Sequence, residues 1–245
     1  MRRRRKRQSR TNVRNNVNKN AELKNSICAH GTGSIFKSKG AVGTGIFRLG
    51  KEPNMANILK ETVRGIETVQ IEDELLRGRE IFLTREVDAQ SSGELIKQLM
   101  YLEREDSEKE ITLYINSPGG EVISGLAVYD YIQFMKAPLR TVCLGTAASM
   151  GAILFLAGEK REMFLHTRLM IHDPSYSHRD IGGRKPHEIQ HELDKLNETR
   201  EALARIIADK TKKSMEEIYE VTADDTYYSA KEAVDFGLAT GIIGK

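Results

Sequence analysis

Apolar side chains recur with the periods of strands and helices over most of the chain after residue 55. Residues 111–115 alternate apolar and polar positions, which predicts a strand that stops at Asn-Ser-Pro-Gly-Gly, residues 116–120. Residues 92–103 place their leucines and isoleucine on one face, which predicts an amphipathic helix. The same patterns predict further strands over 81–83, 140–144 and 168–172, and helices over 122–135, about 149–157 and about 186–210.

Strands therefore alternate with helices, a pattern typical of an α/β fold with mostly parallel pairing. Two more helices near the end of the chain are predicted by capping boxes, Ser214 with Glu217 and Ser229 with Glu232. Gly237 is a plausible stop for the second of these helices. No internal repeat is visible.

Residues 1–54 differ from the rest because Asn, Lys, Arg, Gly and Ser dominate and no period persists. We expect a disordered basic extension here and a globular domain over 55–245. The Arg-rich start is compatible with a nucleic-acid or polyanion contact, a nuclear address or a transit segment. The favoured interpretation is a cleaved or dispensable extension, such as a propeptide, or a start codon upstream of a true start at Met55.

Charge separates the same two segments. Residues 1–54 hold 14 Lys/Arg against two acids, a net charge of +12, whereas the other 24 bases and 33 acids give 55–245 a net charge of −9. The overall charge of +3 is therefore no argument that the domain binds nucleic acid. No apolar run approaches the length of a membrane span, and the Arg-rich start lacks the apolar core of a secretory signal. Two cysteines, Cys28 and Cys143, weakly favour a reducing compartment.

A candidate nucleophile lies in Thr-Ala-Ala-Ser-Met-Gly-Ala, residues 146–152, between a predicted strand and a predicted helix. A turn of this kind exposes the hydroxyl of Ser149, and small neighbours let a substrate carbonyl approach. The segment is not the hydrolase elbow G-x-S-x-G, because Ala147 replaces the first glycine. On local sequence alone, a helix N-cap is the better interpretation of Ser149.

The glycines of residues 116–120 offer a second candidate, a loop whose exposed N–H groups line an oxyanion hole or hold an extended peptide. An ordinary turn is an equally good interpretation. His172 ends a predicted strand and is a candidate general base, while His166 is a weaker one. Asp224 and Asp225 precede a capped helix, where an acid either serves the turn or orients an imidazole.

His187-Glu-Ile-Gln-His191 matches the zinc-protease helix motif H-E-x-x-H. The helical phase argues against a metal site, because the two histidines lie about 200° around the helix from its apolar stripe. They are therefore expected to face solvent, and we predict no metal. The stripe consists of Ile189, Leu193, Leu196, Leu203 and Ile207.

Five segments together resemble one family, the proteolytic subunit of the ATP-dependent Clp protease. They are LLRGREIFLTREVD (75–88), LYINSPGGEVISGLAVYDYIQF (113–134), TAASMGA (146–152), RLMIHDP (168–174) and YYSAKEAVDFGLATGII (227–243). They occur in the family's order, and the resemblance runs from about residue 61 to 243. It implies a crotonase-like α/β fold of repeated β-β-α units with a protruding handle helix.

The resemblance also implies a serine endopeptidase that cleaves unfolded polypeptides. Ser149 would be the nucleophile, His172 the base and Asp225 the acid, with the adjacent Asp224 as the alternative acid. The backbone N–H groups of Gly120 and Met150 would form the oxyanion hole. A non-catalytic or weakly active subunit of a mixed ring is the alternative, disfavoured because all three triad residues are present. A crotonase-type acyl-CoA enzyme is disfavoured by the Ser-Met-Gly and Met-Ile-His motifs.

The family's partners are implied in the same way. Two stacked seven-membered rings would enclose the active sites, and an AAA+ unfoldase of the Clp type would deliver substrate and hydrolyse the ATP, so this chain needs no cofactor. Tyr114, Phe134 and Phe164 fall on aromatic positions of the family's unfoldase-docking pocket, from which Thr112 departs. The expected location is the bacterial cytoplasm, with a mitochondrial matrix or plastid as the less favoured alternative.

Three other features depart from the family. The basic extension is longer than the family's short axial N-terminal loop. Asp173 stands where Gln is usual after the base. Residues 175–185 are longer and more charged than the family's Gly-rich segment, which contributes to ring-to-ring packing and lies beside the substrate.

Overall fold

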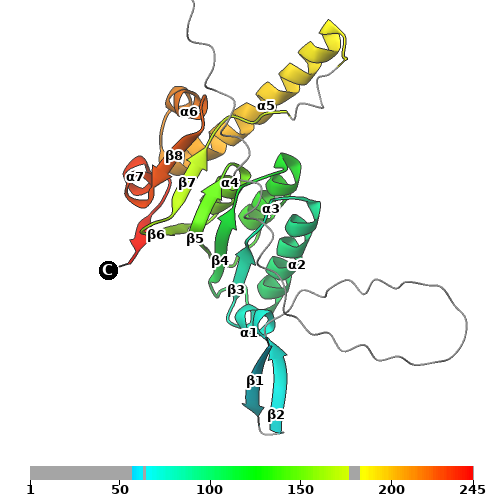
Figure 1. Cartoon of the computed structure of the whole chain (residues 1–245), viewed down its shortest axis with the longest axis vertical. Helices are drawn as coiled ribbons and strands as arrows, with labels where there is room; N and C mark the ends of the chain where they lie inside the picture. The colour runs from blue at the N-terminus through cyan, green and yellow to red at the C-terminus, as the bar shows by residue number, and fades with distance from the viewer. Residues whose placement is uncertain (1–56, 63–64, 177–182, 245) are drawn as a thin grey trace, which may run out of the picture. The chain divides into compact units, whose positions relative to one another are not determined.

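The computed structural model describes residues 57–62, 65–176 and 183–244 (Figure 1). All of these residues belong to one structural unit, Glu52–Lys245. The basic extension 1–54 and residues 177–182 of the altered segment lie outside the described ranges. None of the helices in the described ranges has the length and apolar character needed to cross a bilayer.

Seven strands form one sheet in the described ranges, and two more form a separate hairpin. The sheet contains β3 Glu80–Leu83, β4 Ile111–Ser117, β5 Leu139–Ala148, β6 Lys160–Phe164, β7 Arg168–Ile171, β8 Thr226–Ser229 and β9 Gly241–Ile243. The hairpin contains β1 Asn57–Thr62 and β2 Gly65–Gln70. The helices are α1 Ile71–Arg77, α2 Ala89–Glu105, α3 Val122–Phe134, α4 Met150–Leu156, α5 Pro186–Thr211, α6 Met215–Thr222 and α7 Ala230–Phe236.

The sheet is mostly parallel, as the alternation of strands and helices predicts. Strands β3, β4, β5, β6 and β9 follow one another side by side. The long strand β5 serves two partners, because residues 140–143 pair with β6 and residues 146–148 pair with β7. Strand β8 then pairs antiparallel with β7. The carboxyl ends of β5 and β7 and the start of β8 therefore meet at one place.

Alternation along the central strands separates a buried face from an open one. Ile111, Leu113 and Ile115 of β4 are fully buried, whereas Thr112 and Tyr114 between them are only half-buried. Helices α2, α3 and α4 supply apolar side chains to the same core as the buried face, and Figure 1 shows them together on one side of the sheet. This core fixes the strand ends that carry the candidate site.

The hydrophobic pattern missed several short elements and misplaced some ends. Hairpin β1–β2, helix α1 and strands β8 and β9 were not predicted, because they are short or lack a regular buried face. Helix α2 begins three residues earlier than predicted, where the Asp88 side chain accepts the Ser91 N–H and caps it. Strand β5 continues to Ala148 through residues expected to form a turn.

Helix α5 corrects the prediction about its apolar stripe. Leu203 and Ile207 are buried as expected, but Ile189 is 40% exposed and Leu193 is 47% exposed. The N-terminal half of α5 extends away from the sheet (Figure 1), so its part of the stripe lies apart from the core that the described residues form. The apolar stripe is therefore continuous along the sequence, but only its C-terminal part is buried in the core of the structure.

Candidate active site

Ser149, His172 and Asp225 lie together because the ends of three neighbouring strands meet. Ala148 of β5 pairs with Met170 of β7, which puts Ser149 beside the end of β7. The Ser149 N–H donates to the Met170 carbonyl over 2.9 Å. Because β8 runs antiparallel to β7, the residue before β8, Asp225, lies opposite His172.

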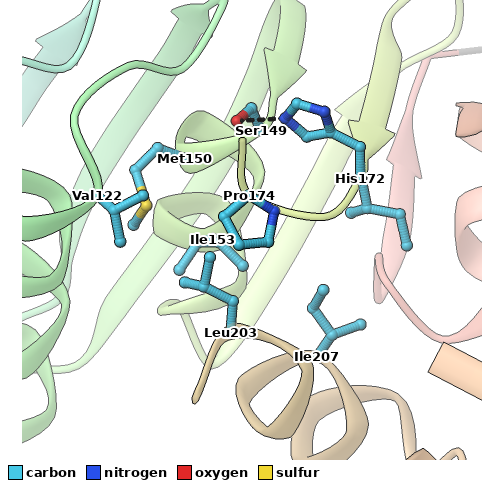
Figure 2. A pocket seen from close by; sticks show the side chains of 9 residues that line it. Val122, Ser149, Met150, Ile153, His172, Pro174, Leu203 and Ile207 are labelled. Carbon is cyan, nitrogen blue, oxygen red and sulfur yellow. Dashed lines mark hydrogen bonds between the residues drawn. The ribbon is translucent and has the colours of Figure 1, made fainter. Parts of the chain in front are cut away.

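Ser149 has the backbone of a strained turn. Its φ of 52° and ψ of −121° are rare for a residue with a side chain. The residue occupies the N-cap position of α4, as the local sequence suggests, but its side chain makes no capping hydrogen bond. The hydroxyl instead lies 2.8 Å from His172 Nε2 (Figure 2). The strand-to-helix turn thus exposes the hydroxyl in the manner of a hydrolase elbow, without its first glycine.

His172 is held between the serine and a carboxylate. Its Nδ1 lies 3.1 Å from Asp225 Oδ1, so the tautomer with the proton on Nδ1 donates to Asp225 and leaves Nε2 to accept the serine proton. The Asp224 carboxylate has no hydrogen bond or ion pair in the part of the chain that the structure describes, although its carbonyl accepts from Thr226. Of the two adjacent acids, the structure therefore brings only Asp225 to the imidazole.

The glycine turn after β4 lies directly against Ser149. A Cβ on Gly119 would lie 2.7 Å from the Ser149 Cβ, and Gly119 has φ of 96°, so a side chain is excluded there by space and by backbone conformation. The next residue, Gly120, forms a parallel bridge with Val87. In that bridge the Val87 N–H donates to the Gly119 carbonyl and the Val87 carbonyl accepts from Glu121. Because the bridge uses the neighbours of Gly120, its own N–H points to the other side.

Two backbone donors therefore remain available near the serine. Met150 is the first residue of α4, and the N–H groups at the start of a helix have no partner within the helix. Neither this N–H nor that of Gly120 takes part in a hydrogen bond within the described ranges. Both are free to bind an oxygen atom of a ligand beside Ser149.

An apolar pocket opens next to the serine and the histidine (Figure 2). Apart from Ser149 and His172, its lining is entirely apolar: Val122, Met150, Ile153, Ile171, Pro174, Leu203 and Ile207. The sequence analysis did not single out most of these residues, and it placed Leu203 and Ile207 in the apolar stripe of a helix. A helix position that faces the core and one that faces a pocket have the same period, so the sequence could not separate them.

Comparison with known proteins gives one consistent result. The family model described as Clp protease matches residues 63–245. The chain is 38% identical over 192 residues to an ATP-dependent Clp protease proteolytic subunit 1 of Prochlorococcus marinus (strain NATL2A), covering 77% of this chain and 95% of that protein. It is 39% identical over 192 residues to a proteolytic subunit 2 of Parasynechococcus marenigrum (strain WH8102), covering 77% and 94%.

The chain belongs to the Clp protease family. The resemblance found in the sequence is confirmed, and so is the α/β fold of the Clp protease type, with its mixed sheet and seven helices in the described ranges. The family and the named relatives support a peptidase, the proteolytic subunit of a Clp protease.

The three residues expected at a Clp unfoldase pocket lie on three different elements, β4, α3 and β6. The Tyr114 ring stacks on Phe82 with centroids 4.9 Å apart, and its hydroxyl donates to Glu80 over 2.9 Å. Burial raises the pKa of Tyr114, and the Glu80 carboxylate raises it further. Phe134 ends α3 with 83% of its surface exposed, and within the described ranges its ring contact is to another residue of α3. Phe164 is partly exposed on β6.

Phe82 is a residue that sequence reasoning missed. The segment 81–83 was predicted as a short strand, and in the structure Phe82 is 39% exposed while its two neighbours are buried. The signal was present, because a residue between two buried positions of a strand points to the opposite face. Phe82 and Tyr114 therefore form one aromatic pair on the open face of the sheet.

The zinc-protease motif lies on the exposed half of α5. Both His187 and His191 are exposed, but so are Ile189 and Leu193 on the stripe beside them, so helical phase does not account for their exposure. The Glu188 carboxylate accepts the Lys185 N–H over 2.8 Å and so caps the helix. Within the described ranges, no group of three or more His, Cys, Asp or Glu side chains has the arrangement of a metal site.

Proposed function

We propose that this chain is a serine endopeptidase of the Clp type, with Ser149 as nucleophile, His172 as general base and Asp225 as the acid that orients the base. The observation that carries the proposal is the continuous chain of contacts from the serine hydroxyl to the imidazole, 2.8 Å, and from the imidazole to the carboxylate, 3.1 Å. Hydroxyl, base and orienting acid in this order are the parts of a triad.

The reaction is acyl transfer in two steps. Ser149 Oγ forms a bond to the carbonyl carbon of the substrate while its proton passes to His172 Nε2. The imidazolium, held by Asp225, then gives this proton to the amine as the peptide bond breaks, which leaves an acyl-serine. Water enters in place of the amine and gives a proton to the same nitrogen. Its oxygen attacks the ester, and the proton returns to Ser149 as the acid product departs.

The N–H groups of Gly120 and Met150 bind the oxyanion in both steps. Neither donor has a partner within the described ranges, so no existing bond must break when negative charge develops on the substrate oxygen. Gly120 is bridged to Val87 on one side, so its other backbone edge is open beside the serine. An unfolded chain bound there as a strand would place its carbonyl carbon within reach of Ser149.

The pocket beside the serine selects for an apolar side chain in the substrate. Its lining offers no charged partner, so a buried Lys, Asp or Glu side chain would lose its hydration without compensation. We expect peptides with Leu, Met or Phe before the cleaved bond to react faster than peptides with a charged residue there.

Substrate delivery falls to a separate ATPase. The relatives are named as subunits of an ATP-dependent protease, and the mechanism above uses neither ATP nor a metal in this chain. We place the unfoldase contact on the open sheet face around Tyr114 and Phe82, with Phe134 and Phe164 contributed where neighbouring subunits meet. Two stacked rings of seven chains would enclose the active sites. We place the assembly in a bacterial cytoplasm, since the named relatives are cyanobacterial.

The test is covalent labelling of Ser149 with a fluorophosphonate, mapped by peptide mass, with native mass measured on the same sample. The wild type should label at Ser149, and Ser149→Ala should not. The matched control is Ser124→Ala, because the Ser124 hydroxyl is exposed and bonded to Glu121 rather than to a histidine. A chelator should leave labelling unchanged. A large ring in which Ser149 does not react would favour a structural subunit that needs a partner.

A further inference from the structure

Asp173, directly after the proposed base, joins two distant segments. Its N–H donates to the Thr222 carbonyl over 2.7 Å, and its Oδ1 accepts from the Thr222 hydroxyl over 2.7 Å. Thr222 ends α6, three residues before Asp225. The same double contact therefore fixes the segment that carries His172 against the segment that carries Asp225.

Helix α5 contacts the second carboxylate oxygen of Asp173. Arg200, on α5, places its Nε 2.6 Å from Asp173 Oδ2, with Asp173 only 28% and Arg200 33% exposed. The guanidinium also lies 4.3 Å from the centroid of the Tyr219 ring, on α6. The Nε–H is not aligned for a regular hydrogen bond, so charge attraction and stacking hold Arg200 in place. Arg200 thus contacts Asp173, the residue after His172, and helix α6, which precedes Asp225 along the chain.

We propose that Asp173 and Arg200 form a positioning pair through which helix α5 sets the distance between His172 and Asp225; this rests on the proposed peptidase function. Displacement of α5 would draw Arg200 from Asp173 and loosen the contact with Thr222. The His172–Asp225 contact would then lengthen, since both residues follow the joined segments closely along the chain. Gln, usual in the family at position 173, carries no charge for Arg200 to hold.

The positions of Asp173 and Arg200 predict an effect on the rate of reaction rather than on substrate binding. Neither Asp173 nor Arg200 lines the apolar pocket or reaches Ser149. Their removal should leave KM near its wild-type value and lower kcat, because a misoriented base slows proton transfer after substrate has bound. A purely structural role would instead lower the amount of assembled, folded enzyme.

The experiment compares Asp173→Asn, Arg200→Gln and the double variant in the full-length chain. A fluorogenic peptide gives kcat and KM, and the fluorophosphonate gives the labelling rate of Ser149. We expect each single variant to lose about tenfold in kcat and in labelling rate, with KM within about twofold. The double variant should be no slower than the slower single variant, because both changes break the same contact.

The matched control is Arg205→Gln, which removes an exposed ion pair to Glu201 on the same helix. It should leave kcat and labelling unchanged. The proposal is overturned if the two single effects multiply in the double variant, if Arg205→Gln slows the enzyme equally, or if the loss follows the fraction of assembled ring by native mass. It is also overturned if only KM changes.

A structural measurement keeps this proposal separate from the peptidase function. In cryo-electron microscopy maps of Arg200→Gln and Asp173→Asn, the distance from His172 Nδ1 to Asp225 Oδ1 should exceed hydrogen-bond reach, against 3.1 Å here. This readout needs no activity. If wild-type Ser149 does not label but the distance lengthens in the variants, the peptidase proposal fails and the positioning role stands. An unchanged distance in both variants refutes the positioning role.

Discussion

At the residue scale, two adjacent acids of equal chemistry have different surroundings. Asp225 contacts His172 Nδ1, whereas the Asp224 carboxylate has no partner in the described ranges. We predict that Asp225→Asn lowers kcat by about three to four orders of magnitude, because the amide favours the wrong imidazole tautomer. Asp224→Asn, which makes the same chemical change one residue away, should stay within about threefold. Steady-state rates on a fluorogenic peptide check both, and equal losses would reject the assignment.

The buried thiol of Cys143 gives a prediction of how the free energy of unfolding changes with pH. Burial raises the pKa of its thiol from 9.0 to about 11. The unfolded chain therefore releases this proton at lower pH than the folded one, so the contribution is intact below about pH 9 and is lost as pH rises toward 11. The loss is about 1.4 kcal/mol per pH unit in that window.

The thermal midpoint measured from pH 8 to 11 tests this prediction. The wild type should lose stability faster above pH 9 than Cys143→Ala, which lacks the ionisable group. Other groups that titrate in this range are present in both proteins, so the difference between the two curves reports on Cys143. Parallel curves would mean that the thiol does not resist ionisation in the folded state.

At the element scale, the sequence predicted those helices and strands whose apolar period coincides with burial in this chain. Strand β4 and helix α2 are examples, because Leu113 and Leu99 are fully buried where the period requires it. Hairpin β1–β2 was missed because its residues are mostly exposed, and β8 because its pairing with β7 is long-range. Local sequence favoured an N-cap at Ser149, because contact with His172 depends on strand pairing that no local pattern records.

Two helical glycines give a stability prediction at the same scale. A Cβ on Gly93, inside α2, would meet no atom within 4 Å, so Gly93→Ala should stabilise the protein by about 0.5–1 kcal/mol. A Cβ on Gly125, inside α3, would lie 2.5 Å from the Met150 Cγ. Because Met150 is buried, Gly125→Ala should destabilise the protein by about 1–3 kcal/mol.

Denaturation midpoints of the two variants, measured beside wild type at equal protein concentration, provide the check. The two changes in stability are expected to have opposite signs, whereas helix propensity alone would stabilise both variants. A stabilised Gly125→Ala would show that α3 and α4 can separate without loss.

At the scale of the whole molecule, helix α5 serves two environments. Its C-terminal half contributes Leu203 and Ile207 to the core and to the pocket beside Ser149. Its N-terminal half presents Ile189 and Leu193 to solvent in the isolated chain. An apolar period predicts that side chains are buried but does not say which chain buries them. We therefore expect the exposed part of this stripe to be covered by a second copy of the chain.

The last prediction follows from this division. If the exposed part of the stripe joins two rings, Leu193→Glu places a charge in an apolar contact between them and should reduce the particle to single rings. The matched control is His191→Glu, which adds the same charge on a different face of the same exposed turn. Native mass should halve for Leu193→Glu and stay unchanged for His191→Glu. Because Arg200 lies further along the same helix, single rings should also show slower labelling of Ser149, whereas labelling at the wild-type rate would mean that α5 does not transmit ring contact to the site.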